Sequence, residues 1–143
     1  MRPVQRTLFF LGVVALLSGG CAKDSLDVDV SGIELSVTLE RFDRELFEMD
    51  QDTMDGAIGS LYGTYGDFFD VFNVHVISIG PASSRRYSSY LSMFINDPTN
   101  REVYEYTRDV FSSTGAIERE LTEGFKHYLY HYPDSLQPRV VAY

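Results

Sequence analysis

The stretch "IELSVTLERFDRELFEMDQ", residues 33–51, changes its hydrophobic period midway, and this change decides the expected fold. In its first half, every second residue is apolar: Ile33, Leu35, Val37 and Leu39. Such alternation predicts a strand with one buried face. In its second half, the apolar spacing becomes four and then three: Phe42, Leu46 and Met49. The stretch therefore predicts a strand that runs directly into a helix.

Four further segments carry the apolar spacing of amphipathic helices. They are residues 61–81, 83–98, 99–113 and 116–132. In the first, second and fourth, the residues of the apolar face are Leu61, Tyr65, Phe68, Phe69 and Phe72; Tyr87, Tyr90, Leu91 and Phe94; and Ile117, Leu121, Phe125, Tyr128 and Tyr132. The two glycines of "LYGTYG", residues 61–66, are too sparse to hold a phosphate and predict a turn between helices.

Capping residues place the ends of these helices. Ser83 or Ser84 is the expected N-cap of the helix predicted within residues 83–98. Asp97-Pro98 supplies the N-cap and first residue of the helix predicted within residues 99–113. Thr114-Gly115 starts the fourth, which Pro133 ends.

The last six residues, "PRVVAY", predict a second strand. The expected fold is therefore α+β and helix-dominated, with several short amphipathic helices and one strand near each end. Because the sequence ends within this apolar strand, two residues after Val140-Val141 and without a polar cap, we expect either a longer natural protein or a last strand that pairs at a sheet edge.

Composition limits the classes of protein that this chain can represent. Its 143 residues are 44% hydrophobic, which suffices for the core of one domain. A single cysteine, Cys21, excludes an intramolecular disulfide and a thiolate zinc cluster. The role of that thiol is then nucleophile, core residue or site of modification.

The position of Cys21 favours modification. Arg2 and Arg6 precede an apolar run from Leu8 to Leu17, and small residues lead into the cysteine, as in a secretory signal. The run has about ten residues, half of the roughly 20 that a membrane-spanning helix needs. The small residues before Cys21 resemble a bacterial lipobox, although Ser18 stands where leucine is usual. We expect a signal peptide over residues 1–20 and a lipid on Cys21; the alternatives are a free thiol after ordinary cleavage or a buried core cysteine.

The segment after Cys21 is polar, and we interpret residues 21–32 as the acylated cysteine followed by an acidic tether. Lys23-Asp24 resembles part of an export signal for surface lipoproteins; the alternative is a plain solvated linker. The chain carries 12 basic and 21 acidic residues, a net charge of −9. Loss of Arg2 and Arg6 with the signal leaves 10 against 21, or −11, so nucleic acid and anionic lipid head groups are poor partners.

No catalytic motif stands out in the sequence. His127 and His131 lie four residues apart on the last helix and are weak candidate metal ligands; the alternative is a solvated flank on which Glu123 supports His127. The carboxylates of Asp67, Asp70, Glu102, Glu105 and Asp109 are expected to be solvated, and Arg85-Arg86 is an ordinary basic spot. A nucleophile elbow and a nucleotide-binding glycine loop are both missing from the sequence. We therefore expect a protein that is not an enzyme and that has no cofactor besides the lipid.

The order of several motifs resembles the amino-terminal half of the GldB gliding-motility lipoproteins. These motifs are "VTLERFDRELF", "LYGTYGDFF", "ISIGP", "YLSMFINDP", "EVYEYTRDVF", "ELTEGFKHYLYHYP" and "PRVVAY". Arg41-Phe42-Asp43, Gly80-Pro81 and Phe125-Lys126 are the most specific parts. The resemblance implies that residues 33–143 form one GldB-like domain, incomplete at its C-terminus, and transfers no functional residue besides Cys21.

The resemblance also implies a function. It suggests a cell-envelope lipoprotein, held on a membrane by its lipid, that docks an acidic or aromatic surface onto other motility proteins. One alternative is the non-catalytic half of a lipid-anchored zinc hydrolase. Another is a surface lipoprotein that binds glycans or peptides, suggested by ten tyrosines and ten phenylalanines.

Overall fold

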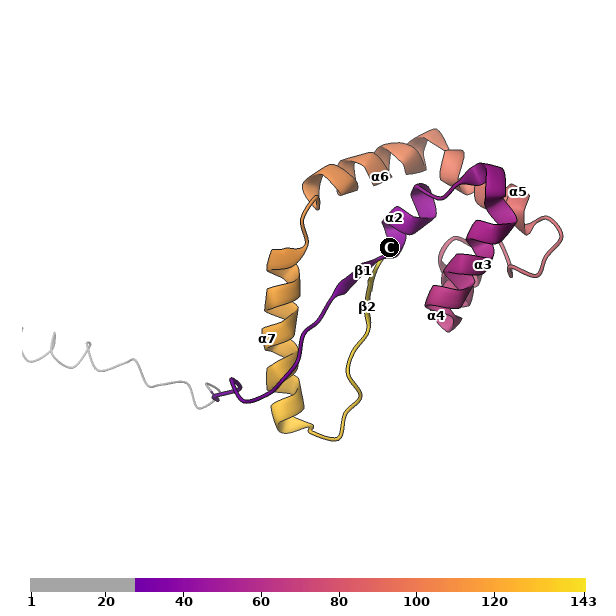
Figure 1. The fold of residues 1–143 in the computed structure, drawn as a ribbon. Helices are drawn as coiled ribbons and strands as arrows, with labels where there is room; N and C mark the ends of the chain where they lie inside the picture. The colour runs from indigo at the N-terminus through magenta and orange to yellow at the C-terminus, as the bar shows by residue number, and fades with distance from the viewer. Residues whose placement is uncertain (1–27) are drawn as a thin grey trace, which may run out of the picture.

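A computed structural model describes residues 28–143, and the expectations for the signal peptide, Cys21 and Lys23-Asp24 lie outside these residues. Six α-helices and a two-stranded parallel sheet form the regular structure of the described part, together with one 3-10 turn and one π-helical turn (Figure 1). In chain order the elements are β1 (Leu39–Arg41), α2 (Phe42–Phe47), η1 (Gln51–Thr53), α3 (Met54–Tyr65), α4 (Asp67–Val71), η2 (Phe72–Val76), α5 (Tyr87–Asn96), α6 (Pro98–Val110), α7 (Gly115–His131) and β2 (Val140–Ala142). The helix-dominated α+β class is confirmed, with one strand near each end.

The two strands pair with each other. Leu39 faces Val140 and Arg41 faces Ala142 in the parallel register. Arg139, just before β2, places its guanidinium 2.6 and 2.7 Å from the carboxylate oxygens of Glu40 and lowers the pKa of that carboxyl. It also donates to the carbonyl of Thr64 at 2.7 Å. One arginine therefore joins β2 to both β1 and α3.

The first strand is shorter than its sequence pattern predicts. Ile33, Leu35, Val37 and Leu39 are indeed less exposed than the residues between them, so the predicted alternation is confirmed, although only Val37 is fully buried and the other three are half-buried. The ladder nevertheless covers only three residues. At the first residue of the ladder, the amide of Leu39 donates to Glu118 Oε1 at 3.0 Å, and upstream of the ladder the amide of Val37 donates to Thr122 Oγ1 at 3.0 Å. Side chains of α7 thus satisfy amides that a strand would otherwise pair.

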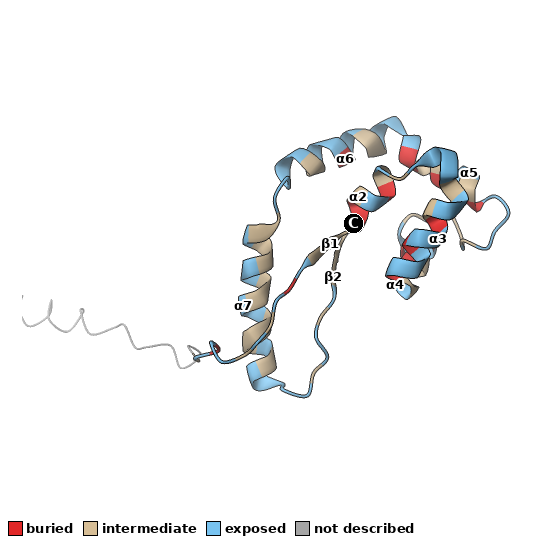
Figure 2. Ribbon diagram, in the orientation of Figure 1, coloured by how far each residue is buried: buried red, intermediate tan, exposed pale blue. Residues whose placement is uncertain are grey.

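The core is aromatic and centres on Phe42, which is fully buried. Because α2 begins immediately after β1, the strand delivers this ring to the rings of the later helices. Phe42 meets Tyr65 and Phe72 edge to face, with ring centroids 4.9 and 4.8 Å apart. Figure 2 shows that buried residues concentrate in α2 to α5, whereas α7 has none.

The segment 61–81 is not one helix. Gly66 separates α3 from α4 at φ 50° and ψ −126°, a conformation that residues with a Cβ rarely adopt. The turn predicted from the two glycines is confirmed at Gly66, and the uninterrupted helical face is wrong. The core nevertheless contains residues from both sides of the break: Leu61 and Tyr65 before Gly66, and Phe69 and Phe72 after it.

Two N-caps had opposite outcomes. The cap at Asp97-Pro98 is confirmed, since the Asp97 carboxylate accepts from the amides of Thr99 and Asn100 at 3.0 and 3.1 Å. The cap at Ser83 or Ser84 is wrong, because α5 begins at Tyr87 and residue 86 precedes it. Two successive turns, from Pro81 to Ser84 and from Ser84 to Tyr87, delay the helix by almost one turn.

Parts of the predicted apolar faces also remain exposed. On α5, Tyr90 is 40% exposed and Ile95 is buried instead. On α7, Ile117, Leu121 and Phe125 are half-buried, while Tyr128 and Tyr132 are exposed. The apolar stripe of α7 therefore packs only partly against the rest of the chain. None of the helices within residues 28–143 has the length and apolar character to cross a bilayer.

Candidate functional site

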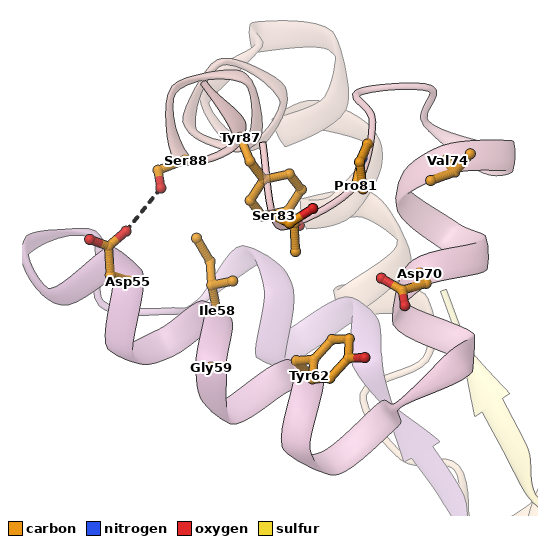
Figure 3. A pocket seen from close by; sticks show the side chains of 11 residues that line it. Asp55, Ile58, Gly59, Tyr62, Asp70, Val74, Pro81, Ser83, Tyr87 and Ser88 are labelled. Carbon is orange, nitrogen blue, oxygen red and sulfur yellow. Dashed lines mark hydrogen bonds between the residues drawn. The ribbon is translucent and has the colours of Figure 1, made fainter. Parts of the chain in front are cut away.

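A hollow of about 550 Å³ opens between α3, the α4–η2 segment and the start of α5. From α3 it is lined by Asp55, Ile58, Gly59 and Tyr62; from α4–η2 by Asp70 and Val74; and from the loop and α5 by Pro81, Ala82, Ser83, Tyr87 and Ser88 (Figure 3). We call it the acidic pocket. The break at Gly66 produces it, because that break turns α4 away from the axis of α3.

Two carboxylates give the acidic pocket its charge. Asp55 accepts a hydrogen bond from Ser88 Oγ at 2.9 Å, which fixes it at one wall (Figure 3). Asp70 lies at the opposite wall, and within residues 28–143 neither carboxylate forms an ion pair with a Lys, Arg or His side chain. The ring of Tyr62, 47% exposed, points into the same opening.

The charge of this region extends beyond the pocket. Residues 45–84 contain no lysine and no arginine. Their seven acidic residues are Glu45, Glu48, Asp50, Asp52, Asp55, Asp67 and Asp70. Arg85 and Arg86 follow directly, are exposed, and do not line the pocket. The electrostatic potential at the acidic pocket is therefore negative.

Tyr87 forms a buried wall of the pocket and is only 1% exposed. Burial raises the pKa of its hydroxyl, the nearby Asn73 amide lowers it, and the negative charge of Asp70 raises it further. The Tyr87 hydroxyl and the Asn73 side-chain oxygen both lack a hydrogen-bond partner in the described chain. The two groups are therefore neighbours outside hydrogen-bond geometry, and Tyr87 stays neutral at physiological pH.

This combination suits the binding of a cation. Carboxylates provide charge-assisted acceptors for an ammonium or guanidinium group, and the face of an exposed tyrosine attracts the same groups. Ser83 and Ser88 add hydroxyls at the rim. The site thus has the chemistry to hold a Lys or Arg side chain of a partner.

The motif Arg41-Phe42-Asp43 has a structural role. The Arg41 guanidinium contacts both carboxylate oxygens of Asp43, at 2.8 and 2.5 Å, and donates to the carbonyl of Phe111 at 2.8 Å. Arg44 reaches the same carbonyl at 3.3 Å. These bonds join the β1–α2 junction to the link between α6 and α7. The motif therefore positions the helices and lies apart from the acidic pocket.

The weak metal candidates are not brought together with other ligands. His127 is half-buried, and His131 is exposed with its ring against Tyr130 at 5.2 Å between centroids. Glu123 pairs with Lys126 at 2.9 Å, so the expected support of His127 by Glu123 is wrong. A shorter step of three residues brings the lysine, a stronger base, to that carboxylate. Nowhere in residues 28–143 do three His, Cys, Asp or Glu side chains group to hold a metal ion.

The candidate carboxylates separate into two groups. Glu102, Glu105 and Asp109 are exposed on α6, as predicted for a solvated helix face. Asp70 lines the acidic pocket, whereas Asp67 does not. Sequence reasoning missed Asp55, Tyr62 and Ser88 as pocket residues. The sequence signal available for this region was the run of forty residues, 45–84, without a lysine or arginine.

Residues 23–143 match the family described as gliding motility protein GldB. The chain belongs to the GldB family. Its resemblance to these proteins is thereby confirmed over the majority of the chain, including the Arg41-Phe42-Asp43 junction and the whole acidic pocket. A search of curated proteins and a search of solved structures found no match. Family membership associates the chain with gliding motility and with lipoproteins of the cell envelope.

Proposed function

We propose that this GldB-family chain is a lipid-anchored envelope protein that supports gliding by docking another motility component, and that it catalyses no reaction itself. The observation that carries the proposal is the family match over residues 23–143. Two features of this chain give the proposal its form: the cysteine two residues before that match and the acidic pocket within it.

The anchor follows from the sequence around Cys21. Acyl chains on this residue would hold the chain on a membrane, because each buried methylene contributes about 0.8 kcal/mol and two or more chains give stable binding. The folded residues then lie outside the hydrocarbon core of the bilayer, with the lipid as the only covalent addition.

The docking surface follows from the acidic pocket. Asp55 and Asp70 hold two carboxylates at facing walls, and no cation of the described residues 28–143 pairs with either, so an incoming Lys or Arg side chain finds charge and an exposed aromatic ring together. A basic segment of another envelope motility protein is the partner that this chemistry suits.

Metabolic labelling with a clickable palmitate analogue tests the anchor. The wild-type protein should acquire the label and fractionate with membranes, whereas Cys21→Ser should do neither. A label that persists in Cys21→Ser would show that the lipid, if any, is attached elsewhere and would refute this part of the proposal.

Complementation of a deletion strain tests the docking role. Normal spreading of colonies in the deletant would refute a role in gliding, and loss of a peptidase activity together with gliding would argue for an enzyme. In a non-gliding deletant, Asp55→Asn with Asp70→Asn should fail to restore spreading although the protein reaches wild-type levels.

The matched control is Asp109→Asn with Glu105→Gln. It removes the same charge from the exposed face of α6 and should restore spreading fully. Equal behaviour of the two double variants would mean that net charge matters and the pocket does not.

A further inference from the structure

The C-terminal end of α7 exposes an unusual number of aromatic side chains. Tyr128, Tyr130 and Tyr132 are 45, 50 and 60% exposed, and Leu136 in the following loop is 92% exposed. We call these four residues the α7 foot. Tyr128 and Tyr132 lie against each other, with ring centroids 5.1 Å apart.

The tyrosines of the foot surround the helix end. At 100° per residue, Tyr130 lies about 200° from Tyr128, so the two rings point to opposite sides of α7. A neighbouring helix or sheet covers one face of a helix and could not contact both. A surface that receives the end of the helix can contact both sides at once.

The first part of the described chain, residues 28–39, lies alongside α7 and begins near the C-terminal end of that helix. Its amides at residues 39 and 37 bond to Glu118 and Thr122, so the segment runs antiparallel to α7. Two residues of an extended chain advance about 6.6 Å along its axis, and four residues of a helix advance about 6 Å. Each further pair of residues in the segment therefore lies opposite the next four residues of α7. Continued upstream, this register brings the turn at residues 30–33 close to Tyr130. Figure 1 shows the described chain starting beside the end of α7 from which the loop to β2 departs.

Cys21 is therefore within short reach of the foot. Seven residue steps separate Cys21 from Val28, and even a fully extended chain spans no more than about 25 Å over seven residues. A lipid on Cys21 thus keeps the bilayer within that distance of the start of the described chain, whatever path the tether takes.

The chemistry of the foot suits the interface of a bilayer. Tyrosine combines an apolar ring with a hydroxyl that can stay hydrated, and such residues gather at the level of lipid head groups. Leu136 adds an apolar side chain that water otherwise surrounds. The charged and titratable neighbours include Lys126 with its partner Glu123, then His127, His131 and Asp134. Asp29 and Glu34 flank the turn at residues 30–33, so the set is mixed with an acidic excess and favours zwitterionic over anionic lipid.

We propose that the α7 foot rests in the head-group region of the bilayer that holds the Cys21 lipid, and so fixes the orientation of the folded chain on the membrane. This inference rests on the proposed acylation of Cys21. It adds a second, non-covalent membrane contact made by named side chains.

The absence of tryptophan from the sequence allows a direct test. Tyr132→Trp introduces a single tryptophan into the foot, whose emission can be excited apart from that of the tyrosines, and Tyr130→Trp provides a second reporter on the other side of the helix. The control is Tyr106→Trp on α6, a residue that is 73% exposed. All three positions are exposed, so the substitutions should preserve the fold, and far-ultraviolet circular dichroism checks this.

Each acylated mature variant, residues 21–143, is reconstituted in phosphatidylcholine vesicles with and without brominated acyl chains. Tyr132→Trp and Tyr130→Trp should lose most of their emission to the bromines, whereas Tyr106→Trp should lose none. Equal quenching of all three, or no quenching of either foot reporter, would overturn the inference. A blue shift in native membranes without bromine quenching in vesicles would show that a protein covers the foot and would also overturn it.

Palmitate labelling of the same preparations separates the two proposals. An unlabelled Cys21 overturns the anchor and this inference together. A labelled Cys21 with unquenched foot reporters overturns this inference alone and leaves the proposed function standing.

Discussion

Removing the guanidinium of Arg41 should destabilise the folded chain strongly. The Arg41 and Asp43 side chains are 14 and 11% exposed, so Arg41→Ala leaves a carboxylate largely dehydrated and without its cation. The substitution also deprives the carbonyl of Phe111 of a donor at 2.8 Å. Breaking a buried ion pair by removing one partner costs about 3–5 kcal/mol. We expect about 3 kcal/mol, because both side chains keep some contact with water.

A double-mutant cycle measures the pairing itself. Arg41→Ala, Asp43→Ala and the double variant are compared by urea unfolding of the mature chain carrying Cys21→Ser, which is free of lipid. The double variant should lose less stability than the sum of the two single variants, by about 1–3 kcal/mol, because the second substitution removes the unpaired charge that the first created.

The same cycle also tests the link between distant elements. In Arg41→Ala, amide hydrogen exchange should accelerate around Phe111, where the shortest of the bonds from β1–α2 to the α6–α7 link is lost. Strict additivity, or a loss below about 1 kcal/mol for Arg41→Ala, would show that Arg41-Phe42-Asp43 does not hold these elements together.

Three further predictions concern the backbone, the core and the pocket. Gly66→Ala should destabilise the chain by more than about 1 kcal/mol, because φ is 50° at this residue. Gly63→Ala, inside α3, should instead stabilise the chain by about 0.5–1 kcal/mol. Midpoints of urea unfolding that move in the same direction for both variants would contradict this prediction. Burial, with a hydrogen bond to Glu48, raises the pKa of Tyr104 to about 12, so its ionisation is easier in the unfolded chain and stability should fall as pH rises from about 10 to 12. Tyr104→Phe should make that fall shallower, and an unchanged pH profile of unfolding would refute the assignment. In the pocket, Asp70→Asn should weaken the binding of an arginine-rich peptide, measured by calorimetry, more than Asp109→Asn does; equal losses would argue against a specific site.

Local features of the fold could be predicted because they depend on neighbouring residues. The alternation of Ile33, Leu35, Val37 and Leu39 marks a buried face whether or not a ladder forms. The cap at Asp97-Pro98 is equally local, since the carboxylate bonds to amides two and three residues later. The serine cap failed because Ser84 enters a turn that ends at Tyr87, and no local signal distinguishes this turn from the first turn of a helix.

The acidic pocket could be predicted only in part. The lack of lysine and arginine over 45–84 indicates a negative region, but Asp70 was expected only to be solvated. Its pairing with Asp55 and Tyr62 required the reorientation of α4 at Gly66. A glycine in the sequence allows that conformation without setting the direction in which the next helix leaves.

The sequence by itself determined the helix-dominated class, the aromatic composition of the core, the position of the cysteine and the excess of acidic residues, because each is a property of spacing or count. Only the tertiary structure decided which distant residues meet. Glu40 pairs with Arg139 across 99 positions, and the carboxylates of Asp55 and Asp70 come to face one cavity from two helices. Such meetings depend on how whole elements pack around Phe42, and the energy of that packing is shared among many residues, so no short stretch of sequence encodes it.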